Sequence, residues 1–84
     1  MPEIVLYTTD WCGLCDRAKA LLDAARLAYR EVSLADDPAF RQRVFDLGGR
    51  WTVPLVVVDG RPLGGYQELV AAARSGRLAE LLAA

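Results

Sequence analysis

The segment IVLYTTDWCGLC, residues 4–15, indicates the architecture of the whole chain. Residues 3–8 are rich in Ile, Val, Leu, Tyr and Thr and are typical of a buried strand. Cys12 and Cys15 follow at Cys-x-x-Cys spacing, and residues 13–26 then carry apolar side chains at helical spacing. A strand, a Cys-x-x-Cys turn and a helix in this order are typical of a thiol–disulfide redox site.

Cys12 stands at the start of the predicted helix, where its anion is favoured. A thiolate rather than a thiol attacks a disulfide, and the unpaired N–H groups and dipole of a helix N-terminus stabilise negative charge. We expect the amides of Leu14 and Cys15 to point at the Cys12 sulfur, and Gly13 leaves a further N–H available. We therefore predict that Cys12 is the exposed nucleophile with a lowered pKa. Cys15, one turn further in and more buried, is expected to resolve the mixed disulfide.

The rest of the chain predicts a small mixed α/β fold. Turn signals mark a strand at 29–34, a helix opened by Asp37-Pro38 and ended by Gly48-Gly49, a strand at 55–58, a hairpin turn at Asp59-Gly60, a strand at 61–63 and a helix at 66–82. The first two strands should be parallel through a right-handed crossover, and the hairpin makes the last pair antiparallel. Pro62 favours an edge position for the last strand, and Gly76 marks a bend or restart in the last helix.

This β-α-β-α-β-β-α order is thioredoxin-like, an α/β fold with a four-stranded mixed sheet and helices on both faces. On the second helix, Phe40, Val44 and Leu47 fall on one stripe and are expected to point inward. Phe45 is expected in the core as well. Trp51 either lines a substrate groove or fills the core beneath this helix, and we favour partial exposure.

Length and composition narrow the classes of protein and of partner. The chain has 84 residues, which suits one domain over residues 1–84. A net charge of −1 and the absence of a basic face argue against nucleic acid as a partner. No apolar run approaches the ~20 residues that cross a bilayer. The beginning of the chain, Met1-Pro2-Glu3, shows no signal peptide, so we expect a cytoplasmic protein without a membrane partner.

Cysteine and histidine usage narrows the role of the Cys-x-x-Cys pair. A structural zinc site needs four ligands, and the chain has two cysteines and no histidine. We therefore expect no metal site within one chain. A pair of inert core cysteines is also disfavoured, because a single cysteine serves packing equally well. In a reducing compartment such a pair is more often catalytic than structural.

Several motifs together resemble those of the glutaredoxins, and the small bacterial members in particular. They are Leu6-Tyr7-Thr8-Thr9, Trp11-Cys12-x-x-Cys15, Ala18-Lys19-x-Leu21-Leu22, Thr52-Val53-Pro54, Gly64-Gly65-Tyr66-Gln67-Glu68-Leu69 and Ser75-Gly76-Arg77-Leu78. The resemblance runs from residue 4 to about residue 82. It implies a thioredoxin fold and a disulfide oxidoreductase that reduces protein disulfides or glutathione mixed disulfides. It also implies glutathione or another small thiol as co-substrate, with no tightly bound cofactor, and we expect a monomer.

The resemblance also implies roles for single residues around Cys12. Cys12 matches the nucleophile that forms a mixed disulfide with glutathione, and Cys15 matches the resolving cysteine. A cis peptide bond between Val53 and Pro54 would turn the backbone of Val53 toward Cys12, where it pairs with the cysteinyl unit of glutathione. The other residues of these two motifs expected to contact substrate are Trp11, Gly13, Leu14 and Thr52.

The two ends of glutathione have expected partners further along the chain. Gly65 and Tyr66 lead into a helix whose first amides, those of Gln67 and Glu68, receive the γ-glutamyl carboxylate. Arg41 matches a residue that reaches the glycyl carboxylate. Glu68 stands where the family usually has an aspartate that caps this helix and holds the glutamyl amine. Because glutamate is longer, we expect it to cap poorly.

Three alternative functions remain open from the sequence. Trp11 and Gly13 match glutaredoxins that hold an iron–sulfur cluster between two subunits, with Cys12 of each chain and two glutathione thiols as ligands. A redoxin reduced directly by thioredoxin reductase is a second alternative. Such proteins usually have Trp-Ser-Gly-Phe where this chain has Leu63-Gly64-Gly65-Tyr66, which argues against it. A binding module whose thiols are incidental is the third.

Overall fold

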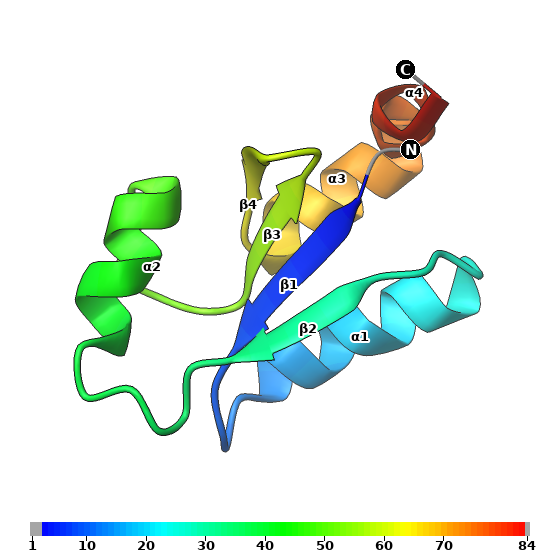
Figure 1. Ribbon diagram of the computed structural model, residues 1–84. Coiled ribbons are helices and arrows are strands. Elements are labelled where there is room, and N and C mark those ends of the chain that lie inside the picture. The colour runs from blue at the N-terminus through cyan, green and yellow to red at the C-terminus, as the bar shows by residue number, and fades with distance from the viewer. Residues whose placement is uncertain (1–2, 84) are drawn as a thin grey trace.

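The structure is a computed structural model that describes residues 3–83 (Figure 1). Its elements are, in chain order, β1 (Ile4–Thr8), α1 (Gly13–Ala24), β2 (Arg30–Ser33), α2 (Phe40–Gly48), β3 (Leu55–Val58), β4 (Arg61–Gly64), α3 (Tyr66–Ser75) and α4 (Arg77–Ala83). Met1 and Pro2, on which the expectation of no signal peptide partly rests, lie outside the described residues, as does Ala84 at the end of the predicted domain. None of the helices within residues 3–83 is long and apolar enough to cross a membrane.

The strands form one mixed sheet in the order β2-β1-β3-β4. β1 pairs with β2 in parallel, and the crossover between them contains α1. β3 pairs in antiparallel fashion with both β1 and β4. Pro62 lies on β4, an edge strand, which confirms its predicted position and leaves the central ladder intact. The thioredoxin-like fold predicted from the order of elements is therefore present.

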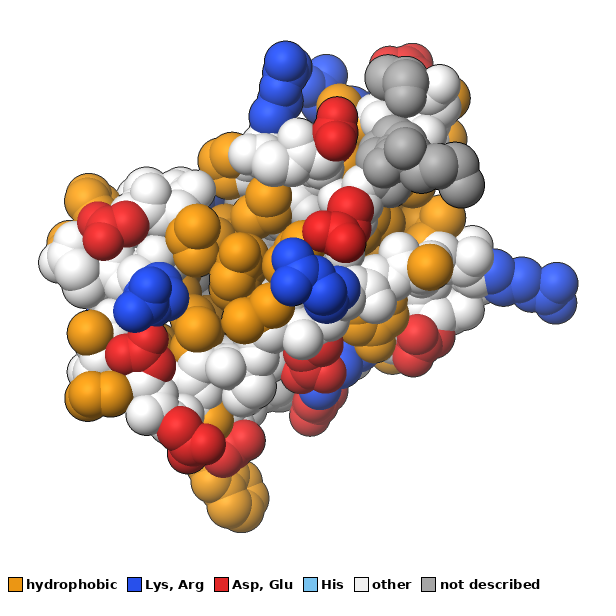
Figure 2. Space-filling model, viewed as in Figure 1, with side chains coloured by type: hydrophobic (Ala, Val, Ile, Leu, Met, Phe, Trp, Pro, Cys, Tyr) orange, Lys and Arg blue, Asp and Glu red, His pale blue; other side chains and the backbone are white. Residues whose placement is uncertain are grey.

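Side chains that alternate along the central strands build a core on each face of the sheet. One core joins strand residues to α1, α3 and α4, and its buried members are Ile4, Leu6, Ala18, Leu22, Val56, Val58, Leu69, Ala72 and Leu78. The other lies under α2 and contains Val5, Leu34, Val44, Leu55 and Val57. α2 thus covers the face opposite α1 and α3 (Figure 1). In the same view, apolar side chains gather beside α2, with charges of both signs spread around them (Figure 2).

The start of α2 differs from the prediction. The helix begins at Phe40, whereas Asp37 and Pro38 were expected to open it. The Asp37 side chain instead caps the preceding turn, where Oδ1 accepts the Ala39 N–H at 2.8 Å. The other oxygen, Oδ2, accepts from Arg43 Nε at 2.7 Å. A short aspartate side chain bonds readily to the amide two residues on, and here that local turn replaces the first helical positions.

The inward stripe predicted on α2 is only partly correct. Val44 is fully buried, but Leu47 and Phe45 are each 38% exposed, so the core positions expected for these two side chains are wrong. Within α2 only Val44 is fully buried, because this short helix touches the sheet along a narrow line. The Phe45 ring stacks instead on Trp51, with centroids 4.2 Å apart. Trp51 is 49% exposed, which confirms its expected partial exposure.

The last helix is interrupted at Gly76, where we predicted either a bend or a restart, and the structure shows a restart. Gly76 has a φ of 84°, a left-handed conformation that ends α3 and that glycine adopts without steric cost. α4 then begins at Arg77 and inserts Leu78 into the core. The two short helices therefore pack as one layer despite the break.

Replacement of Leu69 by Ala should strongly destabilise the fold. Leu69 is fully buried between α3 and the sheet, so its truncation leaves a cavity and should lower the free energy of unfolding by about 2–5 kcal/mol. Leu47→Ala is a suitable control because Leu47 is partly exposed, and it should cost less than about 1 kcal/mol. Urea unfolding followed by circular dichroism measures both. Equal losses would contradict this description of the core.

Candidate active site

Cys12 is the N-cap residue of α1, and its backbone is extended, with φ −116° and ψ 100°. Its sulfur accepts the N–H of Cys15 at 3.1 Å, and the two cysteines are joined in a disulfide with their Cα atoms 5.2 Å apart. The predicted contact with the Cys15 amide is confirmed. For Leu14, the hydrogen bonds of residues 3–83 include none to this sulfur, because the N-cap side chain reaches the third helical residue rather than the second.

The two cysteines differ in exposure. Cys15 is buried at 1% exposure, whereas Cys12 is partly exposed at the surface. Next to Cys12, the Trp11 side chain is fully exposed, and its backbone has a φ of 57°. Leu14 is half exposed on the other side. An external molecule can therefore reach the sulfur of Cys12 but not that of Cys15.

The strand and helix that flank this loop are tied together through β2. Thr8, buried at the end of β1, donates from Oγ1 to Glu31 Oε2 at 2.7 Å. Lys19 Nζ on α1 lies 3.1 Å from the same oxygen. The bonds from Thr8 and Lys19 lower the pKa of Glu31, and the Glu31 hydrogen bond raises the pKa of Lys19. This network fixes the positions of both ends of the loop that carries Cys12.

The Thr52-Val53-Pro54 segment lies beside Cys12. The peptide bond between Val53 and Pro54 is cis, as the resemblance implied. The carbonyl oxygen of Val53 is 3.9 Å from the Cys12 sulfur. Pro54 is buried, whereas Thr52 is exposed and Val53 is half-buried. Cys12 and Val53, 41 residues apart in sequence, therefore share one surface.

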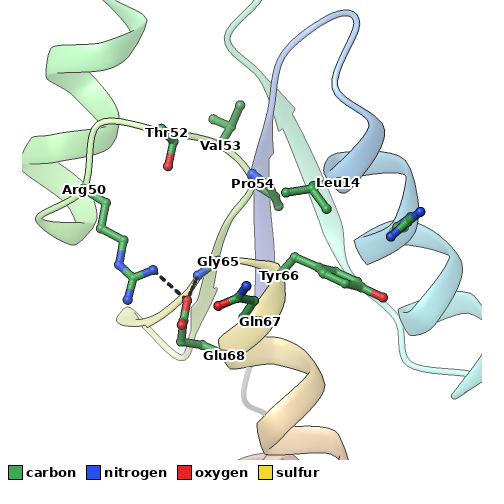
Figure 3. Close-up of a pocket in the computed structure, with 10 residues that line it drawn as sticks. Leu14, Arg50, Thr52, Val53, Pro54, Gly65, Tyr66, Gln67 and Glu68 are labelled. Atoms are coloured by element: carbon green, nitrogen blue, oxygen red, sulfur yellow. Dashed lines mark hydrogen bonds and ion pairs between the residues drawn. The ribbon is translucent and has the colours of Figure 1, made fainter.

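A cavity of about 330 Å³ lies between this segment and the start of α3 (Figure 3). It is lined by Leu14, Arg17, Arg50, Thr52, Val53, Pro54, Gly65, Tyr66, Gln67 and Glu68. All eight predicted substrate-binding residues other than Trp11, Gly13 and Arg41 thus line this one cavity. Arg50 was not predicted as a site residue. The available signal was a cationic side chain two residues before Thr52.

Glu68 caps α3, contrary to the expectation that it caps poorly. Its Oε1 accepts the Gly65 N–H at 2.7 Å and Arg50 Nη1 at 2.8 Å (Figure 3). The longer side chain folds back from the third helical position to the N-cap amide, as in a capping box. The Gly65 N–H, and secondarily the charge of Arg50, lower the pKa of Glu68. Gly64 permits this fold, because a Cβ there would lie 2.6 Å from Glu68 Cγ.

A second cavity, of about 230 Å³, lies on the α2 side of Cys12. Its walls are Thr9, Trp11, Cys12, Phe40, Arg41, Thr52 and Val53. Arg41 Nη1 is 3.5 Å from the carbonyl oxygen of Trp51, and its guanidinium lies 5.1 Å from the Phe40 ring centroid. Arg41 and Trp11 therefore border Cys12, while Gly13 lies in neither set of walls. The two cavities share Thr52 and Val53.

The described part of the chain contains no group of side chains suited to bind a metal ion. Among residues 3–83, no three His, Cys, Asp or Glu side chains lie close enough together to hold a metal ion. An iron–sulfur cluster would need further ligands from outside this chain. Cys12, which is partly exposed, is the cysteine that could provide one ligand from this chain.

The fold and the disulfide at the N-terminus of α1 define a thioredoxin-like redox protein. The family model for glutaredoxin matches residues 4–63. A glutaredoxin of Pseudomonas aeruginosa is 37% identical over 84 residues, covering all of both chains. Glutaredoxin 3 of Escherichia coli K12 is 34% identical over 82 residues, covering 98% of this chain and 99% of that protein. The chain belongs to the glutaredoxin family, and it is a thiol–disulfide oxidoreductase.

Solved structures agree with this assignment. The crystal structure of a buckwheat glutaredoxin–glutathione complex matches with a TM-score of 0.85 and 28% identity, over 98% of this chain and 77% of that one. The solution structure of a glutaredoxin from Brucella melitensis matches with a TM-score of 0.83 and 31% identity, over 95% of this chain and 87% of that one. The likeness extends across nearly the whole chain in each case.

Glu68→Gln should reveal the charged cap of α3. Because the folded-state pKa of Glu68 is lowered, its ionised form stabilises the fold above the ordinary value of 4.5, and this contribution is lost as pH falls through the lowered pKa. We expect the substitution to cost ~1 kcal/mol at pH 7 and progressively less below pH 4.5. Urea unfolding across this range measures the difference. Glu80→Gln on α4 controls for the loss of a charge, and a pH-independent difference would contradict the role of Glu68.

Proposed function

We propose that the protein reduces disulfides with Cys12 as nucleophile, Cys15 as resolving cysteine and glutathione or a similar small thiol as co-substrate. The observation that carries this proposal is the Cys12 sulfur, which caps α1, accepts the Cys15 amide and faces the Val53 carbonyl. Donation from that amide stabilises a thiolate at Cys12 once the disulfide is reduced.

The reaction is two successive thiol–disulfide exchanges. The Cys12 thiolate attacks one sulfur of the substrate disulfide, forms a mixed disulfide and releases the other sulfur as a thiolate, which takes up a proton. The Cys15 thiol then loses its proton, and the resulting thiolate attacks the Cys12 sulfur. This step releases the second substrate thiol and forms the Cys12–Cys15 disulfide seen in the structure. Two equivalents of the small thiol then return the pair to the dithiol and are themselves oxidised to one small disulfide.

The two cavities offer binding groups for each part of glutathione. The Val53 backbone beside Cys12 suits the cysteinyl unit, with Thr52, Pro54 and Leu14 as neighbouring walls. We place the γ-glutamyl carboxylate at the amides of Gln67 and Glu68, preceded by Gly65 and Tyr66. The glycyl carboxylate then lies toward Arg41, near Trp11. The buckwheat relative, solved as a glutaredoxin–glutathione complex, supports this ligand.

The proposal also covers the oligomeric state, the partners and the compartment of the protein. We propose that residues 1–84 act as one domain, as a monomer, without a tightly bound cofactor. Disulfide-containing proteins are the other substrates, and neither nucleic acid nor a membrane is a partner. A reducing cytoplasm would keep the Cys12–Cys15 pair as a dithiol between turnovers.

Single serine substitutions test the two cysteine roles. Cys12→Ser should abolish all reduction, because the attacking sulfur is removed. Cys15→Ser should retain reduction of a glutathione mixed disulfide by the monothiol route, while reduction of a protein disulfide falls. NADPH consumption, coupled through glutathione and glutathione reductase, measures both.

Two results of this experiment would overturn parts of the proposal. Equal losses from Cys12→Ser and Cys15→Ser would refute the division of roles. Turnover with thioredoxin reductase but none with glutathione and glutathione reductase would refute glutathione as the co-substrate.

Arg41→Gln tests the proposed contact between Arg41 and the glycyl carboxylate of glutathione. Loss of a charge-assisted hydrogen bond should raise KM for a glutathione mixed disulfide by roughly tenfold and leave kcat nearly unchanged. The matched substrate is the same mixed disulfide made with glutathione whose glycyl carboxylate is amidated. With that substrate, the wild type and the variant should show similar KM values. A tenfold rise in KM with both substrates would show that Arg41 does not act on the glycyl carboxylate.

A further inference from the structure

Two exposed aromatic rings lie together beside the proposed active site. Phe45 on α2 and Trp51 after it are 38% and 49% exposed, and their rings stack with an interplanar angle of 18°. We call these two residues the aromatic platform. Large aromatic side chains normally contribute to folding by burial, and an adjacent exposed pair is typical of an interaction surface. The reaction at Cys12 described above uses neither ring.

The platform is continuous with the wall of the Cys12 cavity. Trp51 directly precedes Thr52 and Val53, which line both cavities. Its carbonyl oxygen is bonded by Arg41, which also lines the cavity that contains Cys12. Phe45 follows Arg41 by one helical turn, so both project from the same side of α2. A polypeptide chain that leaves the Cys12 sulfur on this side would run over the platform.

One arginine on this side is available to an acidic partner. Two nearby arginines are already paired, Arg43 with Asp37 at 2.7 Å and Arg50 with Glu68 at 2.8 Å. Arg41 differs from them, because among residues 3–83 no carboxylate lies within ion-pair distance of its guanidinium. The surface between Cys12 and the platform therefore offers one available cation beside exposed aromatic rings.

We propose that the aromatic platform docks a polypeptide substrate that carries apolar and acidic side chains next to its disulfide cysteine. This inference rests on the proposed function, because the docked disulfide must reach Cys12. Neither Phe45 nor Trp51 lines the cavity that contains Cys12, so a small disulfide held in that cavity does not touch the platform. Phe45 and Trp51 thus select among protein substrates without taking part in the exchange of electrons.

A single-turnover experiment with two designed peptides tests this proposal. One probe is the symmetrical disulfide of a peptide with Asp and Leu on both sides of its cysteine, and the other has Lys and Ser at those positions. The reduced protein, freed of reductant, supplies both electrons and becomes the Cys12–Cys15 disulfide, and the peptide disulfide becomes two thiols. Acid quenching and chromatography give the rate. Bis(2-hydroxyethyl) disulfide serves as the small substrate.

The variants are Phe45→Ser and Trp51→Ser, with Leu47→Ser as the matched control. Leu47 lies on the same helix with the same 38% exposure as Phe45. Successive residues turn by about 100° around a helix, so Leu47 faces away from Phe45. The wild type should reduce the Asp-Leu peptide faster than the Lys-Ser peptide. Phe45→Ser and Trp51→Ser should each slow the Asp-Leu peptide about fivefold and leave the small disulfide unchanged, while Leu47→Ser changes neither.

Several results would overturn the platform. One is an unchanged rate of Phe45→Ser with the Asp-Leu peptide. Another is that Phe45→Ser slows reduction of the small disulfide as much as reduction of the peptide, because Phe45 would then act only by supporting Thr52 and Val53. A wild type without preference between the peptides would refute the stated partner chemistry. A wild-type dimer that dissociates in Phe45→Ser, seen by sedimentation, would assign the surface to a second copy of the chain.

Failure of the proposed function is distinguishable from these outcomes. The reduced protein itself supplies the electrons in this experiment, so the platform can be tested whether or not glutathione is the co-substrate. Loss of turnover coupled to glutathione refutes the co-substrate, whereas loss of discrimination between peptides refutes the platform.

Discussion

The hydrogen bond from the Cys15 amide to the Cys12 sulfur joins folding to chemistry in this protein. It is an N-cap interaction, so it contributes to the stability of α1 in the way a serine or aspartate cap would. It also places the Cys12 sulfur at the N-terminus of α1, where an anion is favoured. Because β1 and α1 are both anchored through Glu31, the loop between them holds this sulfur against Val53. A disturbance of the sheet would therefore act on the reactive group directly.

A second helix N-terminus, that of α3, is built differently. There the cap comes from within the helix, since Glu68 reaches back to Gly65 and is held by Arg50. The two N-termini face the same stretch of chain, Thr52 to Pro54, from either side. One presents a sulfur and the other presents amides beside a paired carboxylate. Only the segment Thr52 to Pro54 separates them, and a short thiol peptide bound as proposed would contact both.

Much of the fold was predictable because its signals are local. The Cys-x-x-Cys turn, the hairpin at Asp59-Gly60 and the edge position of Pro62 each depend on a few neighbouring residues. The errors concern tertiary contacts. Helical periodicity places Leu47 on the same stripe as Val44, but it does not show how far the neighbouring sheet extends. Glu68 was expected to be a poor cap from its length alone, whereas the fold of the backbone at Gly64 and the position of Arg50 decide its geometry.

Pro62 on the edge strand also affects how copies of the chain can meet. An edge strand normally offers a row of free N–H and C=O groups to a strand of another molecule. Proline interrupts that row because its nitrogen carries no hydrogen, and β4 is only four residues long. A continuous intermolecular sheet is therefore disfavoured at this edge. The protein can expose its reactive loop and its aromatic rings to substrates while this edge resists polymerisation.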